Sequence, residues 1–278
     1  MTTLLTLRAA AGTDPGQSYD VNQDSAYAMV SQTSEGHPLG LFIVADGMGG
    51  HQAGEIASRL AVETIEKELH WLLNPGDGEE TKPSYPRSAL TTAVDAPPTQ
   101  KLEQRLRAAV EQANVAIASY SQDHPGDAGN LGTTVTCALV ADGVAVIANV
   151  GDSRTYLLRG GELRQITQDH SYVAQLVSEG QIRPEDVYTH PRRNVITRSL
   201  GHQRSVDVDL WTQPLQPGDR LLLCSDGLWE MLPDAQLILT PLRDLDDPEE
   251  TVQQLIRAAN NNGGADNIGV VVTHVDSA

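Results

Sequence analysis

Residues 41–54, LFIVADGMGGHQAG, constrain the fold more than any other stretch of the chain. An apolar run ends at Asp46, and Gly47 follows as the first of several closely spaced glycines. A short apolar run bounded by glycines is typical of a buried strand. Asp46 is therefore expected where a buried strand turns into a tight loop. A carboxylate in that position needs a metal ion, a cation or several N–H groups as its partner, because burying it bare is costly.

The overall charge narrows the classes of function. The chain has 278 residues, with 19 Lys and Arg against 37 Asp and Glu, and its formal net charge is −18. This balance argues against nucleic-acid binding and suits metal cations, although an acidic solvated surface explains most of the charges. No apolar window approaches the roughly 20 residues of a membrane span, and the N-terminus does not resemble a signal peptide. We expect a soluble cytoplasmic protein that binds neither nucleic acid nor membrane.

Hydrophobic periodicity predicts helices over 55–73, 101–120 and 248–260. Several short strands lie between them, and Asp142-Gly143 is a hairpin turn signal. Strands that follow one another by hairpins indicate an antiparallel sheet. The predicted strands are 4–10, 26–30, 41–45, 132–140, 144–150, 154–158, 162–166, 206–211, 220–225 and 268–275, with a turn at 12–18.

Two segments interrupt this pattern without dividing the chain. Residues 74–100 are rich in proline and polar side chains, and we interpret them as a long mobile insertion between helices. Residues 167–201 are polar, with short helical pieces and basic side chains, and they are predicted to form a flap inserted in the sheet. We therefore expect a single domain over residues 1–278.

Acids recur where the predicted strands begin or end. A single Asp-Gly after a strand is usually a turn, and Asp142 is interpreted in that way. Five such acids are harder to explain as turns, and carboxylates that converge repel one another unless cations lie among them. Oxygen ligands favour Mg²⁺, Mn²⁺ or Ca²⁺, and two such ions can promote hydrolysis at phosphorus. The five acids are Asp24, Asp46, Asp152, Asp226 and Asp266.

Eight motifs run in order between residues 14 and 275: NQDS, ADGMGGHQAGEIAS, GTTVTCALV, NVGDSRTYLLR, ITQDHS, NVITRSLG, LLLCSDGLWEML and ADNIGVVV. Together they resemble the metal-dependent Ser/Thr protein phosphatase family, type 2C, in its bacterial form. The resemblance implies an α+β fold, in which a central antiparallel β-sandwich is flanked by helices on both faces. It also implies a hydrolase that uses two Mg²⁺ or Mn²⁺ ions and signals by reversing the action of Ser/Thr kinases.

Residue by residue, the resemblance makes Asp46 the ligand that bridges both metals, with the Gly47 carbonyl on one of them. Asp226 and Asp266 complete the other, and Asp24 belongs to the same cluster directly or through water. Asp46, Asp226 and Asp266 are thus the implied catalytic residues, because they hold the ions that share a bridging water or hydroxide.

Three further positions follow from the same resemblance. Asp152 would belong to a third, weaker metal site, although from the residues alone it is equally well a turn acid in a hairpin. Asn267 would orient a neighbouring ligand or a bound water, and Gln23 stands beside the ligands, where many members of the family have Glu.

The motifs also depart from the family pattern. Tyr19 occupies the place of an Arg that grips the substrate phosphate, and a phenol cannot replace a bidentate cation. Met48 stands where eukaryotic members carry a His that serves as a proposed general acid. Arg192, Arg193 and Arg198 either solvate the flap or help to bind a phosphopeptide, as the most obvious local cations. Tyr19 is a weaker candidate for the same role.

The expected activity is hydrolysis of phosphoserine and phosphothreonine in proteins by a monomer, with phosphorylated proteins and Ser/Thr kinases as partners. The alternative is a regulatory pseudophosphatase that binds phosphopeptides, since Tyr19 weakens the phosphate grip. A cysteine phosphatase is excluded because neither Cys137 nor Cys224 begins a C-x₅-R motif, and a P-loop is excluded because no Gly-Lys pair occurs.

Overall fold

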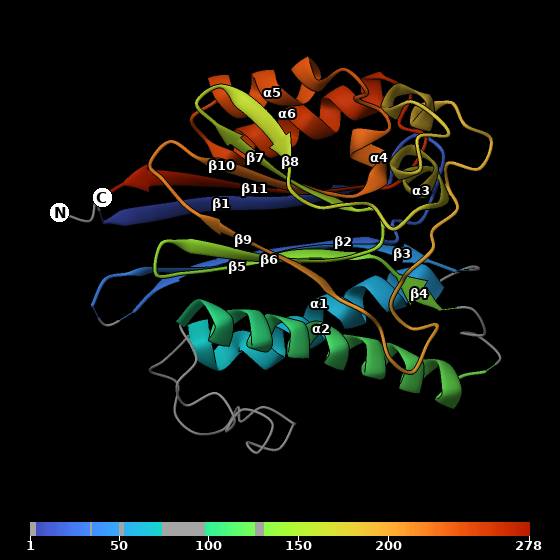
Figure 1. The fold of residues 1–278 in the computed structure, drawn as a ribbon, viewed down its shortest axis with the longest axis horizontal. Helices are drawn as coiled ribbons and strands as arrows, with labels where there is room; N and C mark the ends of the chain where they lie inside the picture. The colour runs from blue at the N-terminus through green and yellow to red at the C-terminus, as the bar shows by residue number, and fades with distance from the viewer. Residues whose placement is uncertain (1–3, 34, 50–52, 74–97, 126–130) are drawn as a thin grey trace.

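Two antiparallel β-sheets lie face to face at the centre of the molecule, and helices cover the outer face of each (Figure 1). The computed structural model describes residues 4–33, 35–49, 53–73, 98–125 and 131–278. The first sheet has the order β1-β11-β10-β7-β8 and the second β2-β3-β5-β6-β9, with β4 paired to β3. The strands are β1 (Leu5–Asp14), β2 (Asp24–Gln32), β3 (Pro38–Met48), β4 (Gly132–Thr133), β5 (Val135–Ala141), β6 (Val144–Val150), β7 (Arg154–Arg159), β8 (Glu162–Gln165), β9 (Asp209–Pro214), β10 (Arg220–Cys224) and β11 (Ile268–Ser277).

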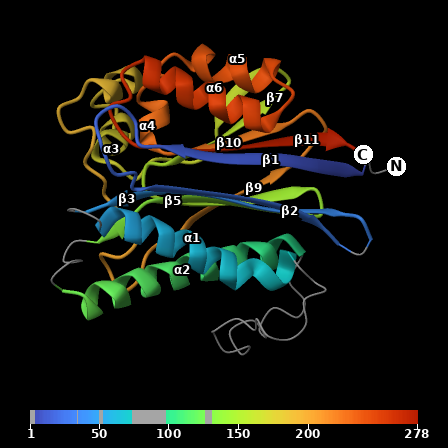
Figure 2. The same ribbon diagram turned by 180° about the vertical axis from the view of Figure 1, so that it is seen from behind.

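The helices form the two outer layers. α1 (Ala53–Leu73) and α2 (Pro98–Asp123) cover the second sheet, whereas α5 (Ala235–Asp244) and α6 (Pro248–Asn261) cover the first (Figure 2). Within the described ranges, no helix combines the length and apolar character needed to cross a membrane. The predicted α+β sandwich with helices on both faces is confirmed.

Three apolar layers hold the sandwich together, and β3 takes part in two of them. Leu41 and Ile43 face α1 and α2, whereas Phe42 and Val44 face the other sheet, because successive side chains of a strand point to opposite faces. All four are fully buried. The apolar run that precedes Asp46 is therefore the centre of the core, and it carries the acid to the end of the sandwich.

Several element boundaries differ from those expected. β1 continues to Asp14 as a partner of β11, so residues 12–14 of the predicted 12–18 turn are strand. Gly12 is there for packing, because a Cβ on it would lie 2.7 Å from Val252 Cγ1 of α6. β9 begins at Asp209 rather than at 206, and α4 (Asp226–Trp229) and α5 are helices that the sequence did not predict. Of the expected insertion 74–100, residues 98–100 belong to α2, and the rest lies outside the described residues.

The expected series of hairpins is broken between β6 and β7. β5 pairs with β6 and β7 pairs with β8, as predicted, but β6 and β7 belong to different sheets. The chain crosses between the sheets at Gly151, which has a φ of 111°, and Asp152 lies in this crossing. Asp152 is therefore not the turn acid of a hairpin.

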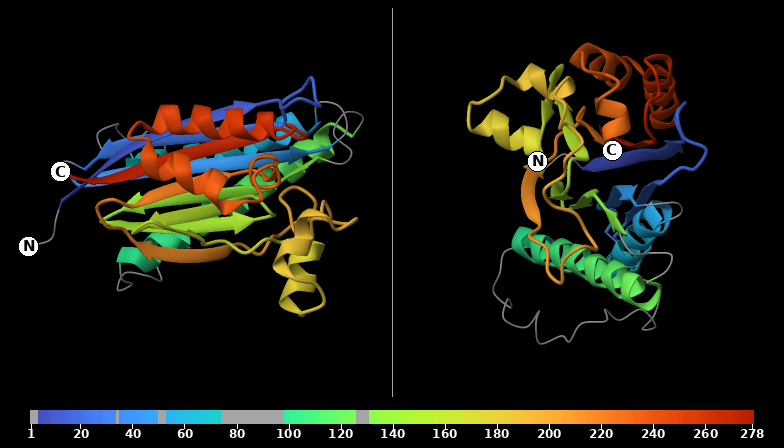
Figure 3. Two further views of the ribbon diagram at one scale, coloured as in Figure 1. Left: turned by 90° about the horizontal axis from the view of Figure 1, so that it is seen from above. Right: turned by 90° about the vertical axis from the view of Figure 1, so that its right-hand side faces the viewer.

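The 167–201 segment lies between β8 and β9 and contains α3 (Tyr172–Ser178) and the 3₁₀ helix η3 (Pro184–Tyr188). Figure 3 shows it beside one end of the sandwich, next to α4. Two isolated bridges tie this part of the chain to itself and to the second sheet, Ser171 with Ile196 and Thr133 with Leu200.

Candidate metal centre

The five acids gather at one end of the sandwich. Asp24 begins β2 and Asp46 lies near the end of β3, and the antiparallel register places the two residues opposite each other. β10 ends and β11 begins at the matching edge of the first sheet, so Asp226 and Asp266 approach from the other side. Asp152 enters from the crossing between the sheets. The chain termini lie at the opposite end (Figure 1).

Burial and mutual repulsion raise the pKa values of these carboxyl groups. Burial is the largest cause of the raised pKa of Asp46, and the charges of the other four acids follow. The pKa of Asp24 rises to about 8 and that of Asp226 to about 7, again mainly through burial. The pKa values of Asp152 and Asp266 are raised by burial as well. Asp46, which responds to all four neighbours, is thus the middle of the cluster.

The carboxyl groups lie close enough to affect one another. The proximity of Asp46 lowers the pKa values of Asp24 and Asp226, against the larger effect of burial. Carboxyl groups held this close together are costly to ionise at the same time unless a cation lies among them. In the described part of the chain, no three His, Cys, Asp or Glu side chains already stand in a finished ligating arrangement. A divalent cation among these oxygens would supply the positive charge that the cluster lacks.

Two carboxylate oxygens in the cluster have no hydrogen-bond partner among the described residues. Asp24 Oδ1 and Asp152 Oδ1 are buried and accept no hydrogen bond from the described residues. Buried polar atoms are nearly always satisfied, so an orphaned carboxylate oxygen indicates an unplaced water or ion. The donor set consists of oxygens, which is the chemistry that Mg²⁺ and Mn²⁺ prefer. These residues therefore fit hard divalent cations.

Three hydroxyl groups hold Asp24 and Asp46 in place through hydrogen bonds. Ser225 Oγ donates to Asp24 Oδ2 at 2.6 Å and accepts the Gly269 N–H at 2.8 Å. The Asp46 N–H donates to Thr134 Oγ1 at 3.1 Å. Its carbonyl accepts from the Thr134 N–H and from Thr133 Oγ1. Sequence reasoning assigned no role to these three hydroxyls, although small hydroxyl residues beside a buried acid are a usable signal.

The glycines after two of the acids are required by close backbone contacts. A Cβ on Gly47 would lie 2.0 Å from the Gly54 carbonyl oxygen, and one on Gly227 would lie 2.0 Å from the Asn267 carbonyl oxygen. Neither residue has a positive φ. The Asp-Gly pairs are therefore compact packing points, and the contact of Gly227 with Asn267 holds Asp226 close to Asp266.

Asn267 latches the loop between β1 and β2. Its Nδ2 donates to the carbonyls of Pro15 at 2.8 Å and Val21 at 3.2 Å, and its Oδ1 accepts the Gln23 N–H at 2.8 Å. Its own N–H donates to Asp266 Oδ1 at 2.8 Å. The Gln23 carbonyl accepts the Gly47 N–H. Asn267 and Gln23 thus lie beside the acids, where they join the loop to the cluster.

The residues expected to bind the substrate make their contacts outside the acid cluster. Tyr19 is 54% exposed on the loop that Asn267 holds. Arg192 is exposed and stacks on Tyr172, with 3.7 Å from its Cζ to the ring centre. Arg193 Nε lies 3.2 Å from Glu230 Oε2, so it is paired already. The acids form one cluster, and these three residues are not part of it.

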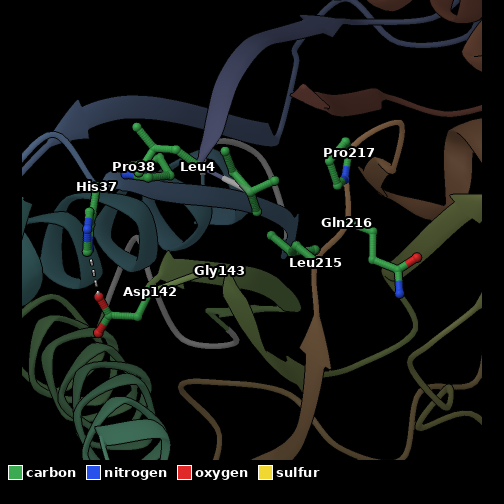
Figure 4. A pocket seen from close by; sticks show the side chains of 9 residues that line it. Leu4, His37, Pro38, Asp142, Gly143, Leu215, Gln216 and Pro217 are labelled. Carbon is green, nitrogen blue, oxygen red and sulfur yellow. Dashed lines mark ion pairs between the residues drawn. The ribbon is translucent and has the colours of Figure 1, made fainter. Parts of the chain in front are cut away.

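Two cavities differ in their relation to the cluster. One of about 760 Å³ is lined by Met48 and by residues 194–199, 202–203 and 205–207. The other, of about 580 Å³, lies between strand ends on the side of the chain termini. In Figure 4 its rim carries His37 and Asp142, which face each other 3.7 Å apart. The first cavity adjoins the loop that follows Asp46, and the second is remote from the five acids.

A sandwich with a buried carboxylate cluster suited to two or more divalent cations is typical of a metal-dependent hydrolase. The family model described as "Protein phosphatase 2C" matches residues 11–267, and the chain belongs to that family. The predicted bacterial 2C-type resemblance is confirmed.

Individual relatives agree. The chain is 39% identical over 272 residues to the serine/threonine phosphatase stp of Listeria monocytogenes, covering 97% of this chain and 96% of that one. The crystal structure of the Mycobacterium tuberculosis serine/threonine phosphatase PstP matches with a TM-score of 0.77 and 38% identity, covering 97% of this chain and 99% of that one. The catalytic domain of PstP in complex with two manganese ions matches with a TM-score of 0.75 and 38% identity, over 98% and 100% of the two chains.

Proposed function

We propose that this protein is a metal-dependent phosphatase that hydrolyses phosphoserine and phosphothreonine in other proteins. One observation carries the proposal: five acids converge in a chain of the 2C family, and all four neighbours raise the pKa of Asp46. Relatives named as serine/threonine phosphatases support the enzyme class, and the manganese complex of PstP supports the cofactor.

In this proposal Asp46 and the Gly47 carbonyl would hold two Mg²⁺ or Mn²⁺ ions, and Asp226 and Asp266 would be further ligands of one of them. Asp24 belongs to the same centre, held by Ser225. When bound, the two ions would supply an activated water and neutralise the charge that develops on the phosphoryl group.

Asp152 is proposed to hold a third, weaker ion. Its buried Oδ1 has no partner among the described residues, which supports this role. Gln23 and Asn267 keep the loop between β1 and β2 against the centre through the hydrogen bonds described above. These two residues act on the geometry of the ligands rather than on the substrate.

The protein part of the substrate is proposed to lie along the cavity beside Met48. Arg192 is the better candidate of the two arginines for a phosphopeptide contact, since Arg193 already pairs with Glu230. Tyr19 could donate one hydrogen bond to phosphate, but it supplies no charge. Nothing in the comparisons favours the phosphopeptide-binding pseudophosphatase.

The oligomeric state, the location in the cell and the domain organisation are proposed from the family resemblance. We propose that the protein acts as a monomer in the cytoplasm, where it opposes Ser/Thr kinases. We also propose that the chain is a single catalytic domain and that its 167–201 segment is a flap over the site. This placement is supported by the contacts of that segment with α4.

The test is turnover of p-nitrophenyl phosphate and of a Ser/Thr phosphopeptide with Mn²⁺, compared between the wild type and Asp226→Ala. The wild type should turn over both substrates only with the metal, and the variant should be nearly inactive. Equal turnover by both proteins would contradict the mechanism. Metal binding without any turnover would favour the non-enzymatic alternative.

A further inference from the structure

A buried arginine lies directly behind the proposed metal centre. Arg154 begins β7, two residues after Asp152, and only 9% of its side chain is exposed. Its guanidinium makes a bidentate pair with Asp169, with Nη2–Oδ2 at 2.7 Å and Nε–Oδ1 at 3.0 Å. Asp169 is equally buried and stands at the start of the 167–201 segment. A third nitrogen, Nη1, donates to the Tyr156 hydroxyl at 3.0 Å.

The face of the same guanidinium lies on an indole ring. Arg154 Cζ is 3.5 Å from the centre of the Trp229 ring, which is a close cation–π contact. Trp229 Nε1 in turn donates to the Asp152 carbonyl at 3.1 Å. The contacts therefore close a ring from Asp152 along the chain to Arg154, across to Trp229, and back to Asp152.

This ring connects two of the acids. Trp229 is the last residue of α4, and Asp226 is the first, so the indole fixes the four-residue helix that presents Asp226. The 167–201 segment contacts this helix directly, as well as Glu230, the residue that follows it. Tyr188 meets the Trp229 ring edge to face at 6.1 Å, and Arg193 pairs with Glu230.

We infer that Arg154 is a positioning residue for the metal centre, whose buried guanidinium couples Asp169 at the base of the 167–201 segment to Trp229 and so sets the separation of Asp152 and Asp226. The inference rests on the proposed function, because it concerns the residues proposed to hold the ions. Arg154 itself touches neither an ion nor the substrate.

The chemistry of the contact requires arginine. A planar fork satisfies a carboxylate with two parallel bonds while its face stacks on a ring, and a lysine ammonium can do only one of these. A buried ion pair gives little net stability, and well-packed apolar residues of similar volume often replace one without loss. Removal of the whole pair should therefore separate positioning from stability.

The experiment compares Arg154→Met/Asp169→Leu with a matched control, Arg159→Met/Asp219→Leu. Arg159 and Asp219 form a similar pair, with Nη2–Oδ2 at 2.6 Å, at the other end of β7. Thermal unfolding is measured without metal, Mn²⁺ affinity by titration calorimetry, and kcat and KM with p-nitrophenyl phosphate. The first double variant should keep its melting temperature, but the Kd for Mn²⁺ should rise roughly tenfold and kcat should fall roughly tenfold, with KM unchanged.

The control variant should bind Mn²⁺ and turn over substrate like the wild type. The inference is overturned if Arg154→Met/Asp169→Leu folds and matches the wild type in Kd and kcat, or if both double variants lose them equally. If that variant does not fold, Arg154→Lys decides by the same measurements. A higher Kd for Mn²⁺ supports the inference, and a Kd equal to that of the wild type overturns it. Failure of the proposed function is distinct, because the wild type itself would then be inactive with Mn²⁺.

Discussion

Asp24 and Asp46 stand opposite each other across the β2–β3 ladder, so two carboxyl groups share one register position. Burial raises the pKa of both side chains, and the charge of Asp24 raises that of Asp46 further. Like charges directly opposite in a sheet are destabilising. Without cations, the fold therefore keeps protons on a cluster that is built to be ionised.

The first prediction is that the metal-free protein loses stability as the pH rises. The pKa values of Asp24 and Asp226 are raised to about 8 and about 7, whereas an unfolded Asp titrates near its ordinary value. Between these values the folded state binds more protons than the unfolded state, so the free energy of unfolding falls from about pH 4 to about pH 8. Thermal unfolding of chelator-treated protein across this range measures the effect.

Addition of Mn²⁺ should reverse the trend. A cation that binds only the ionised folded cluster stabilises it by mass action, and this effect grows as the carboxyl groups lose their protons. The melting temperature with saturating Mn²⁺ should therefore rise with pH over the same range. A metal-free protein that becomes more stable at high pH would contradict the burial of ionisable acids in this cluster.

The second prediction separates stability from activity at one residue. Asp226→Asn removes a charge from the cluster, so the metal-free variant should be more stable than the wild type by about 1–2 kcal/mol near pH 8. The same change removes a proposed ligand, and kcat should fall by about a thousandfold. Denaturant unfolding and p-nitrophenyl phosphate turnover provide the two readouts. A variant that is less stable than the wild type without metal would show that Asp226 is ionised and satisfied by the protein alone.

The third prediction concerns the Asn267 latch. Asn267→Ala removes side-chain hydrogen bonds to Pro15, Val21 and Gln23, so the free energy of unfolding should fall by about 1–3 kcal/mol. The loop should also loosen beside the cluster, and the Kd for Mn²⁺ should rise about tenfold. Asn262→Ala is the matched control, since Asn262 makes one exposed bond to the Met231 carbonyl. An unchanged Mn²⁺ affinity in Asn267→Ala would restrict this residue to a stabilising role.

Much of the fold could be predicted because its signals are local. The apolar run before Asp46, the hairpin turn at Asp142-Gly143 and the period of α6 are each contained in a few residues. The crossing at Gly151 could not be predicted in this way. Whether β6 and β7 pair depends on the second sheet, and a φ of 111° at a glycine is not visible in the sequence.

The site, too, has a part that local sequence signals predict and a part that depends on tertiary contacts. The acids could be predicted because each stands near the beginning or the end of an apolar run, and the structure brings all five together. The sequence alone makes Arg154 a residue that stabilises a hairpin. Its contact with Trp229 was missed, because it joins β7 to α4, which are about 75 residues apart in the chain. Arg193 was assigned to the substrate on charge alone, and its pairing with Glu230 depends on tertiary structure.

The fourth prediction addresses the missing phosphate grip. Tyr19→Arg places a bidentate cation where the family pattern has one, on an exposed loop that can accept it at little cost to stability. KM for phosphopeptides should fall about three- to tenfold, with kcat nearly unchanged, because the new contact is made in both the ground state and the transition state. Val21→Arg, which adds a charge to the same exposed loop, is the control. An unchanged or raised KM for Tyr19→Arg would show that another group already binds the phosphate.

The fifth prediction concerns a buried histidine at the far end of the first sheet. His274 is fully buried in β11, and neither ring nitrogen has a hydrogen-bond partner among the described residues. Burial, followed by the charges of Arg220 and Arg8 on the flanking strands, lowers its pKa to about 4, while Asp276 and Asp246 act in the opposite direction. The ring is therefore neutral in the folded protein.

The consequence is a specific loss of stability in acid. An unfolded histidine takes up a proton near its ordinary pKa, and the folded one does not, so the contribution of His274 to stability falls as the pH drops from about 6.5 to about 4. His274→Leu, an apolar replacement of similar size, should be within about 1 kcal/mol of the wild type at neutral pH and more stable by roughly 2–3 kcal/mol near pH 4. Denaturant unfolding of both proteins at matched pH isolates this group from the acids, which are common to both. A difference between the two proteins that does not change with pH would mean that His274 already carries its proton in the folded state.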